Sequence, residues 1–194
     1  MAIDAGAGTT SKAQSSVPFT MGLLAAVLVI AVVFISQSTW SPPMYAAFKT
    51  VHVMAAVVWI GGAVLLAVLG LVAESKGDPA ELAVIARQAS LVGERLFAPA
   101  GGTVLLMGIA MVIKSGLGFG HFWVILGLVG NGITFILGAF VLTPISKAIS
   151  KSIAEKGPAH PDTAALIRKV LIIARLDVCM LLIVVANMVT KPFG

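Results

Sequence analysis

Residues 44–73 read MYAAFKTVHVMAAVVWIGGAVLLAVLGLVA, a run in which Lys49 is the single Asp, Glu, Lys or Arg residue. A helix needs about 20 mainly apolar residues to cross the hydrocarbon core of a bilayer, which is roughly 30 Å thick. In lipid, every backbone N–H and C=O group must be hydrogen-bonded within the protein, and a helix achieves this without a partner strand. The run therefore predicts a transmembrane helix.

The composition extends this prediction to the whole chain. Of its 194 residues, 59% are hydrophobic and 11% are charged, and the mean hydropathy is +1.06, whereas soluble domains carry roughly 25% charged residues. We predict an all-α, polytopic membrane helical bundle with about five transmembrane helices and the lipid bilayer as its main partner. The single cysteine excludes a disulfide framework. The basic residues lack aromatic neighbours for base stacking, so the net charge of +5 does not indicate a nucleic-acid partner.

The chain divides into three segments. Residues 1–17 are small and polar, which predicts a flexible tail. Residues 18–40 contain an apolar run and no clear A-x-A cleavage site, so we expect an extra N-terminal transmembrane helix and not a cleaved signal peptide. Two prolines then break the helix, and residues 44–193 are expected to form a four-helix membrane core.

The core helices are expected at residues 44–73, 80–113, 121–153 and 162–189. The second of them would be on the order of 50 Å long, so its amphipathic first half must project into water. Pro99, Gly101 and Gly102 predict a kink where this helix enters the membrane, and Pro144 predicts a bend in the next helix.

Basic residues gather on one side of this topology. Nine Lys and Arg residues fall on the side of the N-terminal tail and three on the other. The nine are Lys12, Lys76, Arg87, Arg95, Lys147, Lys151, Lys156, Arg168 and Lys169, and the three are Lys49, Lys114 and Lys191. The positive-inside rule then places the N-terminus in the cytoplasm and the C-terminus outside, in a bacterial cytoplasmic (inner) membrane.

His52 is the most informative polar residue within the apolar runs, because ionisable side chains in a membrane mark functional sites by default. Helical spacing places Lys49, His52 and Trp59 along one face. A neutral imidazole in a helical bundle is a common axial ligand of haem iron, and a nearby lysine can pair with a propionate. The alternative is a histidine that only hydrogen-bonds a neighbouring helix.

Methionines offer a second candidate site. Met107 and Met111 are one turn apart, and Met188 falls near the same outer leaflet as His52. Thioethers with one imidazole suit Cu(I), and a single methionine can be a sixth haem ligand. Methionines in apolar helices are also ordinary packing residues.

Four further charged residues fall within the helices on the cytoplasmic side: Glu94, Arg95, Arg175 and Asp177. Arg95 and Asp177 fall at comparable depths, so an ion pair between them is one expectation. A proton route, or the inner edge of a cofactor pocket, is the other. Asn187 completes the set of buried polar candidates.

Three stretches occur together in an order that resembles a known group of proteins. They are Lys49-Thr50-Val51-His52 with Trp59-Ile60-Gly61-Gly62, then Arg95-Leu96-Phe97-Ala98-Pro99-Ala100, then Met188-Val189-Thr190-Lys191-Pro192-Phe193. Residues 44–193 resemble bacterial predicted integral membrane proteins of unknown function and, more distantly, HemJ-type protoporphyrinogen oxidases and CopD copper-resistance proteins.

The HemJ resemblance implies a b-type haem held by His52. Lys49 would lie at a propionate, Trp59 on the ring, Arg95 at the edge of the cofactor, and Met188 or Met111 at the distal side. The sequence Arg175-Leu176-Asp177-Val178 replaces the Asn-Glu-Pro stretch of HemJ proteins, so the oxidase reaction is not carried over.

Three functions therefore stand at this point: a haem b protein of redox or electron transfer, a copper-handling or small-solute transport protein, and a non-catalytic subunit. The last would act as a homo-oligomer or within a larger membrane complex.

Overall fold

The structure is a computed structural model that describes residues 17–36 and 41–193. All regular elements within these ranges are helices, which confirms the all-α prediction. They are α1 (Val17–Ser36), α2 (Pro42–Lys76), α3 (Pro79–Val92), the π-helical η1 (Gly93–Phe97), α4 (Ala98–Ser115), α5 (Phe122–Leu137), the π-helical η2 (Gly138–Leu142), α6 (Thr143–Lys156) and α7 (Pro161–Thr190). Nearly all of the predicted tail, residues 1–17, lies outside the described residues.

Four continuous helical rods are long and apolar enough to cross a membrane: Pro42–Lys76, Pro79–Ser115, Phe122–Lys156 and Pro161–Thr190. The protein is therefore a multi-pass integral membrane protein with a four-helix core, as predicted. The helix α1 has 20 residues, the length that a bilayer requires. Its insertion as a fifth span stays a prediction.

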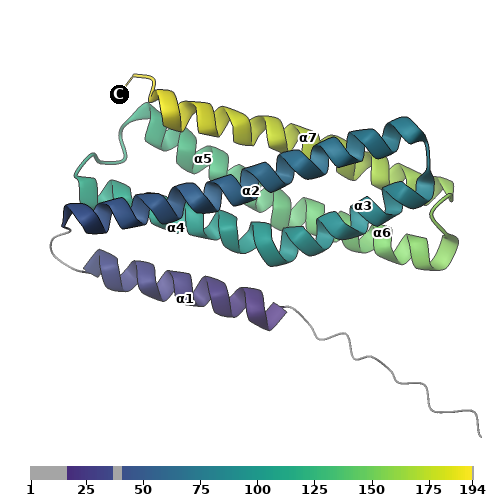
Figure 1. Cartoon of the computed structure of the whole chain (residues 1–194), viewed down its shortest axis with the longest axis horizontal. Helices are drawn as coiled ribbons and strands as arrows, with labels where there is room; N and C mark the ends of the chain where they lie inside the picture. Colours follow the sequence, from purple (N-terminus) through teal and green to yellow (C-terminus); the bar gives the residue numbers. More distant parts are fainter. Residues whose placement is uncertain (1–16, 37–40, 194) are drawn as a thin grey trace, which may run out of the picture.

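The second and third rods each contain one wide π turn that ends two residues before a proline. Pro99 is the second residue of α4, after η1, and Pro144 is the second residue of α6, after η2. A proline lacks an N–H group and its ring clashes with the carbonyl four residues earlier, and a π turn relieves both problems. The predicted kink thus begins before Pro99, at η1, where α3 and α4 meet at a bend (Figure 1). Gly101 and Gly102 lie in regular helix.

The sharp turn between the first two rods follows from local sequence. Gly77 ends α2 with φ +66°, a left-handed conformation that a glycine adopts without steric strain. The Asp78 carboxylate then accepts a hydrogen bond of 2.8 Å from the Ala80 N–H group and caps α3. The two rods therefore run antiparallel.

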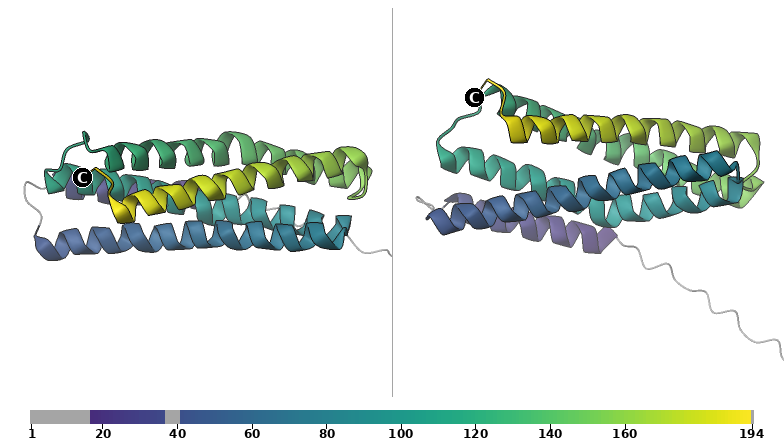
Figure 2. Two further views of the ribbon diagram at one scale, coloured as in Figure 1. Left: turned by 90° about the horizontal axis from the view of Figure 1, so that it is seen from above. Right: turned by 45° about the horizontal axis from the view of Figure 1, so that its top comes forward.

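The four rods lie alongside one another, with α2 against α4, α5 against α7, and α2 also against α7 (Figure 1, Figure 2). The helix α1 packs on the outside of α4. The rods α2 and α7 cross, and they diverge toward the end where α2 begins and α7 finishes.

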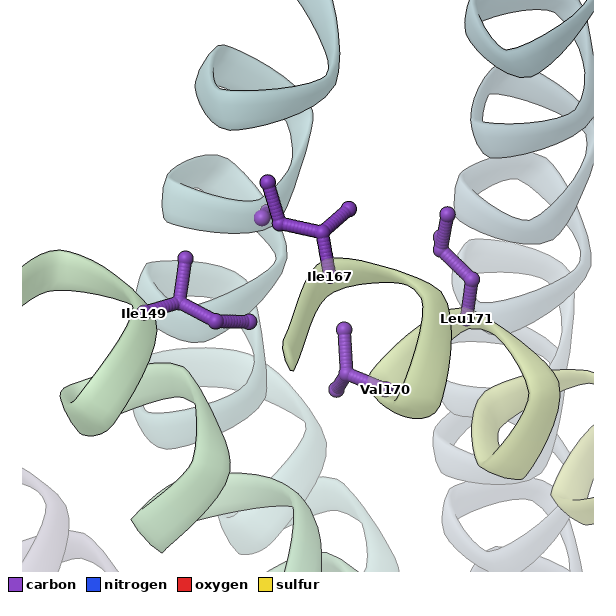
Figure 3. Packing of buried hydrophobic residues seen from close by; sticks show 5 residues of the cluster. Ile149, Ile167, Val170 and Leu171 are labelled. Atoms are coloured by element: carbon purple, nitrogen blue, oxygen red, sulfur yellow. The ribbon is translucent and has the colours of Figure 1, made fainter. Parts of the chain in front are cut away.

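Two apolar clusters hold the ends of the bundle. Ala86, Ile149, Ile167, Val170 and Leu171 join α3, α6 and α7 at one end (Figure 3). The other cluster consists of buried Phe48, Met107 and Ala110, with Met111 and other partly buried side chains around them.

Many of the largest apolar side chains instead point outward, Phe140 being 74% exposed and Leu176 66% exposed. In a membrane protein this outer surface is solvated by lipid, so such exposure is consistent with the assignment.

Candidate functional site

A partly open cavity of about 410 Å³ lies between the helices of the bundle, next to the first cluster, whose Ala86, Val170 and Leu171 form part of its lining. Residues of α2, α3, α5, α6 and α7 line it together with both π segments, η1 and η2. Trp59, which is only 5% exposed, lines it from α2. The sequence did not predict this cavity, because a hydropathy pattern does not show where side chains fail to fill the space between helices.

Glu94, Lys147, Arg175 and Asp177 are the charged residues that line the cavity. Arg175 donates a hydrogen bond to the Glu74 carboxylate, in an ion pair that joins α7 to α2. The Lys147 Nζ atom lies 3.8 Å from Glu94 Oε1. Within residues 17–36 and 41–193, Asp177 has no ion-pair partner and the buried Arg175 Nε atom has no hydrogen-bond partner.

The expected ion pair between Arg95 and Asp177 is wrong, because Arg95 is exposed and is not among the residues that line the cavity. Arg95 lies within η1, and a π turn adds one residue, which rotates the following positions by about 100° relative to a regular helix. Glu74 and Lys147 were not predicted as residues of the site. Glu74 had a signal, since it is an acid in the last turn of a transmembrane helix.

His52 lies where α2 packs against α4. Its Nδ1 atom is 2.8 Å from the carbonyl oxygen of Val104. A carbonyl oxygen only accepts, so Nδ1 carries the proton and donates it, and in the neutral ring Nε2 keeps a free lone pair. A histidine that binds a metal through one ring nitrogen usually donates the N–H of its other ring nitrogen to a neighbouring acceptor, and His52 has this arrangement toward Val104.

The α2–α4 seam, as we call the contact of these two helices, pairs large side chains with glycines. A Cβ atom on Gly108 would lie 3.2 Å from His52 Cε1, and one on Gly101 would lie 3.1 Å from the Trp59 ring. His52 and Trp59 are seven residues apart, as are Gly101 and Gly108, and seven residues return a packed helix to the same face. Because glycine has no side chain, Gly108 leaves room for the His52 ring and Gly101 leaves room for the Trp59 ring. The two helices therefore approach closely.

The His52 ring and the cavity are separate features. Trp59 lines the cavity, whereas His52 is not among its lining residues. Lys49 is exposed in the N-terminal part of α2, one turn before His52. Of the predicted cofactor residues, the structure thus places Lys49 and His52 near one another, puts Trp59 two turns deeper, and leaves Arg95 on the surface.

The predicted methionine ligands have separate packing partners. Met188 of α7 packs on Gly127 of α5, and Met111 packs against the cluster around Phe48. Neither of them lines the cavity. Within the described part of the chain, no group of three or more His, Cys, Asp or Glu residues could hold a metal ion.

Asn187, the remaining polar candidate, joins the ends of α5 and α7. Its side-chain amide donates a hydrogen bond of 2.7 Å to the carbonyl oxygen of Trp123. Lys191 lies 5.1 Å from the centre of the Trp123 ring, a cation–π distance. This role is structural, since it fixes the end of one rod on the next.

Comparison with known proteins identifies the family of the chain. No curated protein and no solved structure matches it. Residues 46–192, most of the four-rod core without α1, match the model of a family described as predicted integral membrane protein (DUF2269). The chain therefore belongs to the DUF2269 family of predicted integral membrane proteins.

Proposed function

We propose that this membrane protein binds haem b through His52 and serves in redox or electron-transfer chemistry. The observation that supports it is the 2.8 Å hydrogen bond from the His52 Nδ1–H group to Val104. That bond orients the ring and leaves Nε2 available to an iron ion. Haem, when bound, would supply a one-electron redox centre.

The chemistry of the side chains around this position suits a haem group. The imidazole is partly buried in a membrane span, and Gly108 leaves the ring its space on α4. Lys49, exposed one turn nearer the outer end, offers a cation to a propionate. Since His52 does not line the cavity, we propose that the porphyrin lies outside the cavity, beside His52.

Copper handling has weaker support, because Met111 and Met188 pack into separate clusters. Small-solute transport and a non-catalytic subunit role are outcomes that the test below can reveal. We further propose a bacterial inner-membrane location with the turn between α2 and α3 in the cytoplasm, on the basis of the nine basic residues against three.

The deciding experiment is the absorption spectrum of the full-length protein purified after expression with haem supply. We expect a Soret band that is lost in His52→Ala and kept in His121→Ala and His160→Ala, which remove the chain's two other histidines. A protein without a Soret band, or a band that survives in His52→Ala, contradicts the proposal. Copper without porphyrin would favour copper handling, and co-purification of stoichiometric partners would favour a subunit role.

A further inference from the structure

We propose that the outward face of α7 is a binding site for an anionic phospholipid. Arg168 and Lys169 bind its phosphate group, and Ile172 and Leu176 pack against one of its acyl chains. The site is separate from His52 and from the cavity, because none of these four residues lines the cavity. Three observations carry the inference: two cations without an acidic partner, the space beside them, and the apolar track that follows them on the same face.

Arg168 and Lys169 are exposed and form no ion pair with any residue that the structure describes. Asp177 lies nine positions after Arg168, which places it about 180° around the helix. Five other acidic residues in this half of the bundle already pair with other basic side chains, namely Glu74, Glu81, Glu94, Glu155 and Asp162. The charges of Arg168 and Lys169 are therefore available to an anion from outside the chain.

The space beside the two cations suits a phosphate group. Arg168, Lys169 and Ile172 line an open groove on α7 together with Ala164 and Ala165. Each alanine lies one turn before one of the cations, and helical side chains tilt toward the N-terminus of their own helix. The two cations therefore extend over the alanines, whose short side chains leave room for the phosphate.

An apolar track continues from the groove along α7. Ile172 is 46% exposed and Leu176 is 66% exposed, and they follow Arg168 by four and eight positions, on the same side of the helix. The cations thus lie where the apolar surface of α7 begins, which is the level of the lipid head groups. A phospholipid places its phosphate at this level and its acyl chains beside the apolar track.

The two charges select the class of lipid. A zwitterionic head group brings its own cation, which neutralises the phosphate within the lipid itself. A lipid with a net negative charge, such as phosphatidylglycerol, leaves the phosphate charge to the protein, and basic residues near a membrane surface attract such lipids. We therefore assign the site to an anionic phospholipid.

Quenching of a fluorophore on Cys179 tests the proposal. Cys179 is the single cysteine of the chain and is exposed. It follows Arg168 by eleven positions, which returns to nearly the same face of α7 about 16 Å farther along the helix. The full chain, labelled there with bimane, is reconstituted in phosphatidylcholine with rising fractions of dibrominated phosphatidylglycerol or dibrominated phosphatidylcholine.

We expect phosphatidylglycerol to bind at least fivefold more tightly than phosphatidylcholine, seen as stronger quenching at the same mole fraction. Equal quenching by the two lipids leaves the cations to water or to a protein partner and overturns the proposal. This comparison uses the parent chain, so it needs no variant to fold. It also involves no change at His52, so its outcome is read separately from that of the haem proposal.

Paired substitutions locate the binding. Arg168→Gln with Lys169→Gln should reduce the preference for phosphatidylglycerol to less than twofold. The matched control is Arg87→Gln with Arg95→Gln, which removes the same charge from two exposed arginines that also form no ion pair with a described residue. The control should keep the preference. A preference that survives the first pair of substitutions, or that both pairs lose equally, overturns the site.

Discussion

Glu74 of α2 and Arg175 of α7, 101 positions apart in the chain, form an ion pair across the bundle. Helical side chains tilt toward the N-terminus of their own helix. Because α2 and α7 are antiparallel, the two side chains tilt toward each other and can meet although their backbones lie at different depths. The pair lies beside the contact of Gly70 with Leu171, which brings the same two helices together.

Breaking this pair should destabilise the protein. In Glu74→Gln the Arg175 guanidinium keeps its charge, with 31% of its side chain exposed, and loses its ionic partner. We expect a loss of about 1–3 kcal/mol, seen as a lower thermal unfolding midpoint in detergent. The control is Glu155→Gln, which breaks the exposed pair with Lys151 and should cost less than about 0.5 kcal/mol. Equal midpoints for the two variants would show that the interhelical pair adds no stability.

Two glycines of α5 should respond in opposite directions to the same substitution. A Cβ atom on Gly130 would overlap the Val184 side chain of α7, whereas one on Gly132 would meet nothing within 4 Å. Alanine favours a helix over glycine by about 1 kcal/mol, and overpacking costs about 1–3 kcal/mol. Gly130→Ala should therefore lower the thermal unfolding midpoint and Gly132→Ala should raise it. A shift of the same sign in both would contradict the described α5–α7 packing.

The number and bounds of the rods could be predicted because hydropathy and proline signals are local. The predicted helix at residues 44–73 is observed as Pro42–Lys76, and the one at 162–189 as Pro161–Thr190. The π turns were not predicted. A hydropathy pattern gives the same signal for a regular helix and for one with an added residue, so only the bend at each proline could be foreseen.

The contacts of the site depend on register between helices, which the sequence does not display. His52 was identified as the candidate ligand, but its acceptor, the Val104 carbonyl, follows from the packing of α2 on Gly101 and Gly108. Arg95 and Asp177 were paired by depth alone, which ignores the rotation that η1 introduces. The two matching spacings of seven residues were present in the sequence and could have indicated the α2–α4 seam.

The space at Gly108 should decide whether His52 keeps its ring orientation. A leucine at 108 would displace the His52 ring, because a Cβ atom there already lies 3.2 Å from Cε1. If the haem proposal holds, Gly108→Leu should reduce the Soret absorbance per protein at least fivefold. Gly61→Leu is the matched control on α2, where an added Cβ atom meets nothing within 4 Å, and it should keep the band. Full haem occupancy in Gly108→Leu would show that Val104 and Gly108 do not orient the ligand.

The orientation of the bundle can be tested at its two ends. Ser75 near the end of α2 and Ser115 at the end of α4 are exposed and lie at opposite ends of the bundle (Figure 1). In a Cys179→Ala background, a membrane-impermeant maleimide should label Ser115→Cys in intact cells and Ser75→Cys only after permeabilisation. Labelling in the opposite pattern would invert the proposed orientation. Ser11→Cys then reports on α1, because the tail shares the side of Ser75 if α1 spans the membrane and the side of Ser115 if it does not. Labelling of Ser11→Cys in intact cells, together with Ser115→Cys, would therefore reject the fifth span while leaving the four-rod core as described.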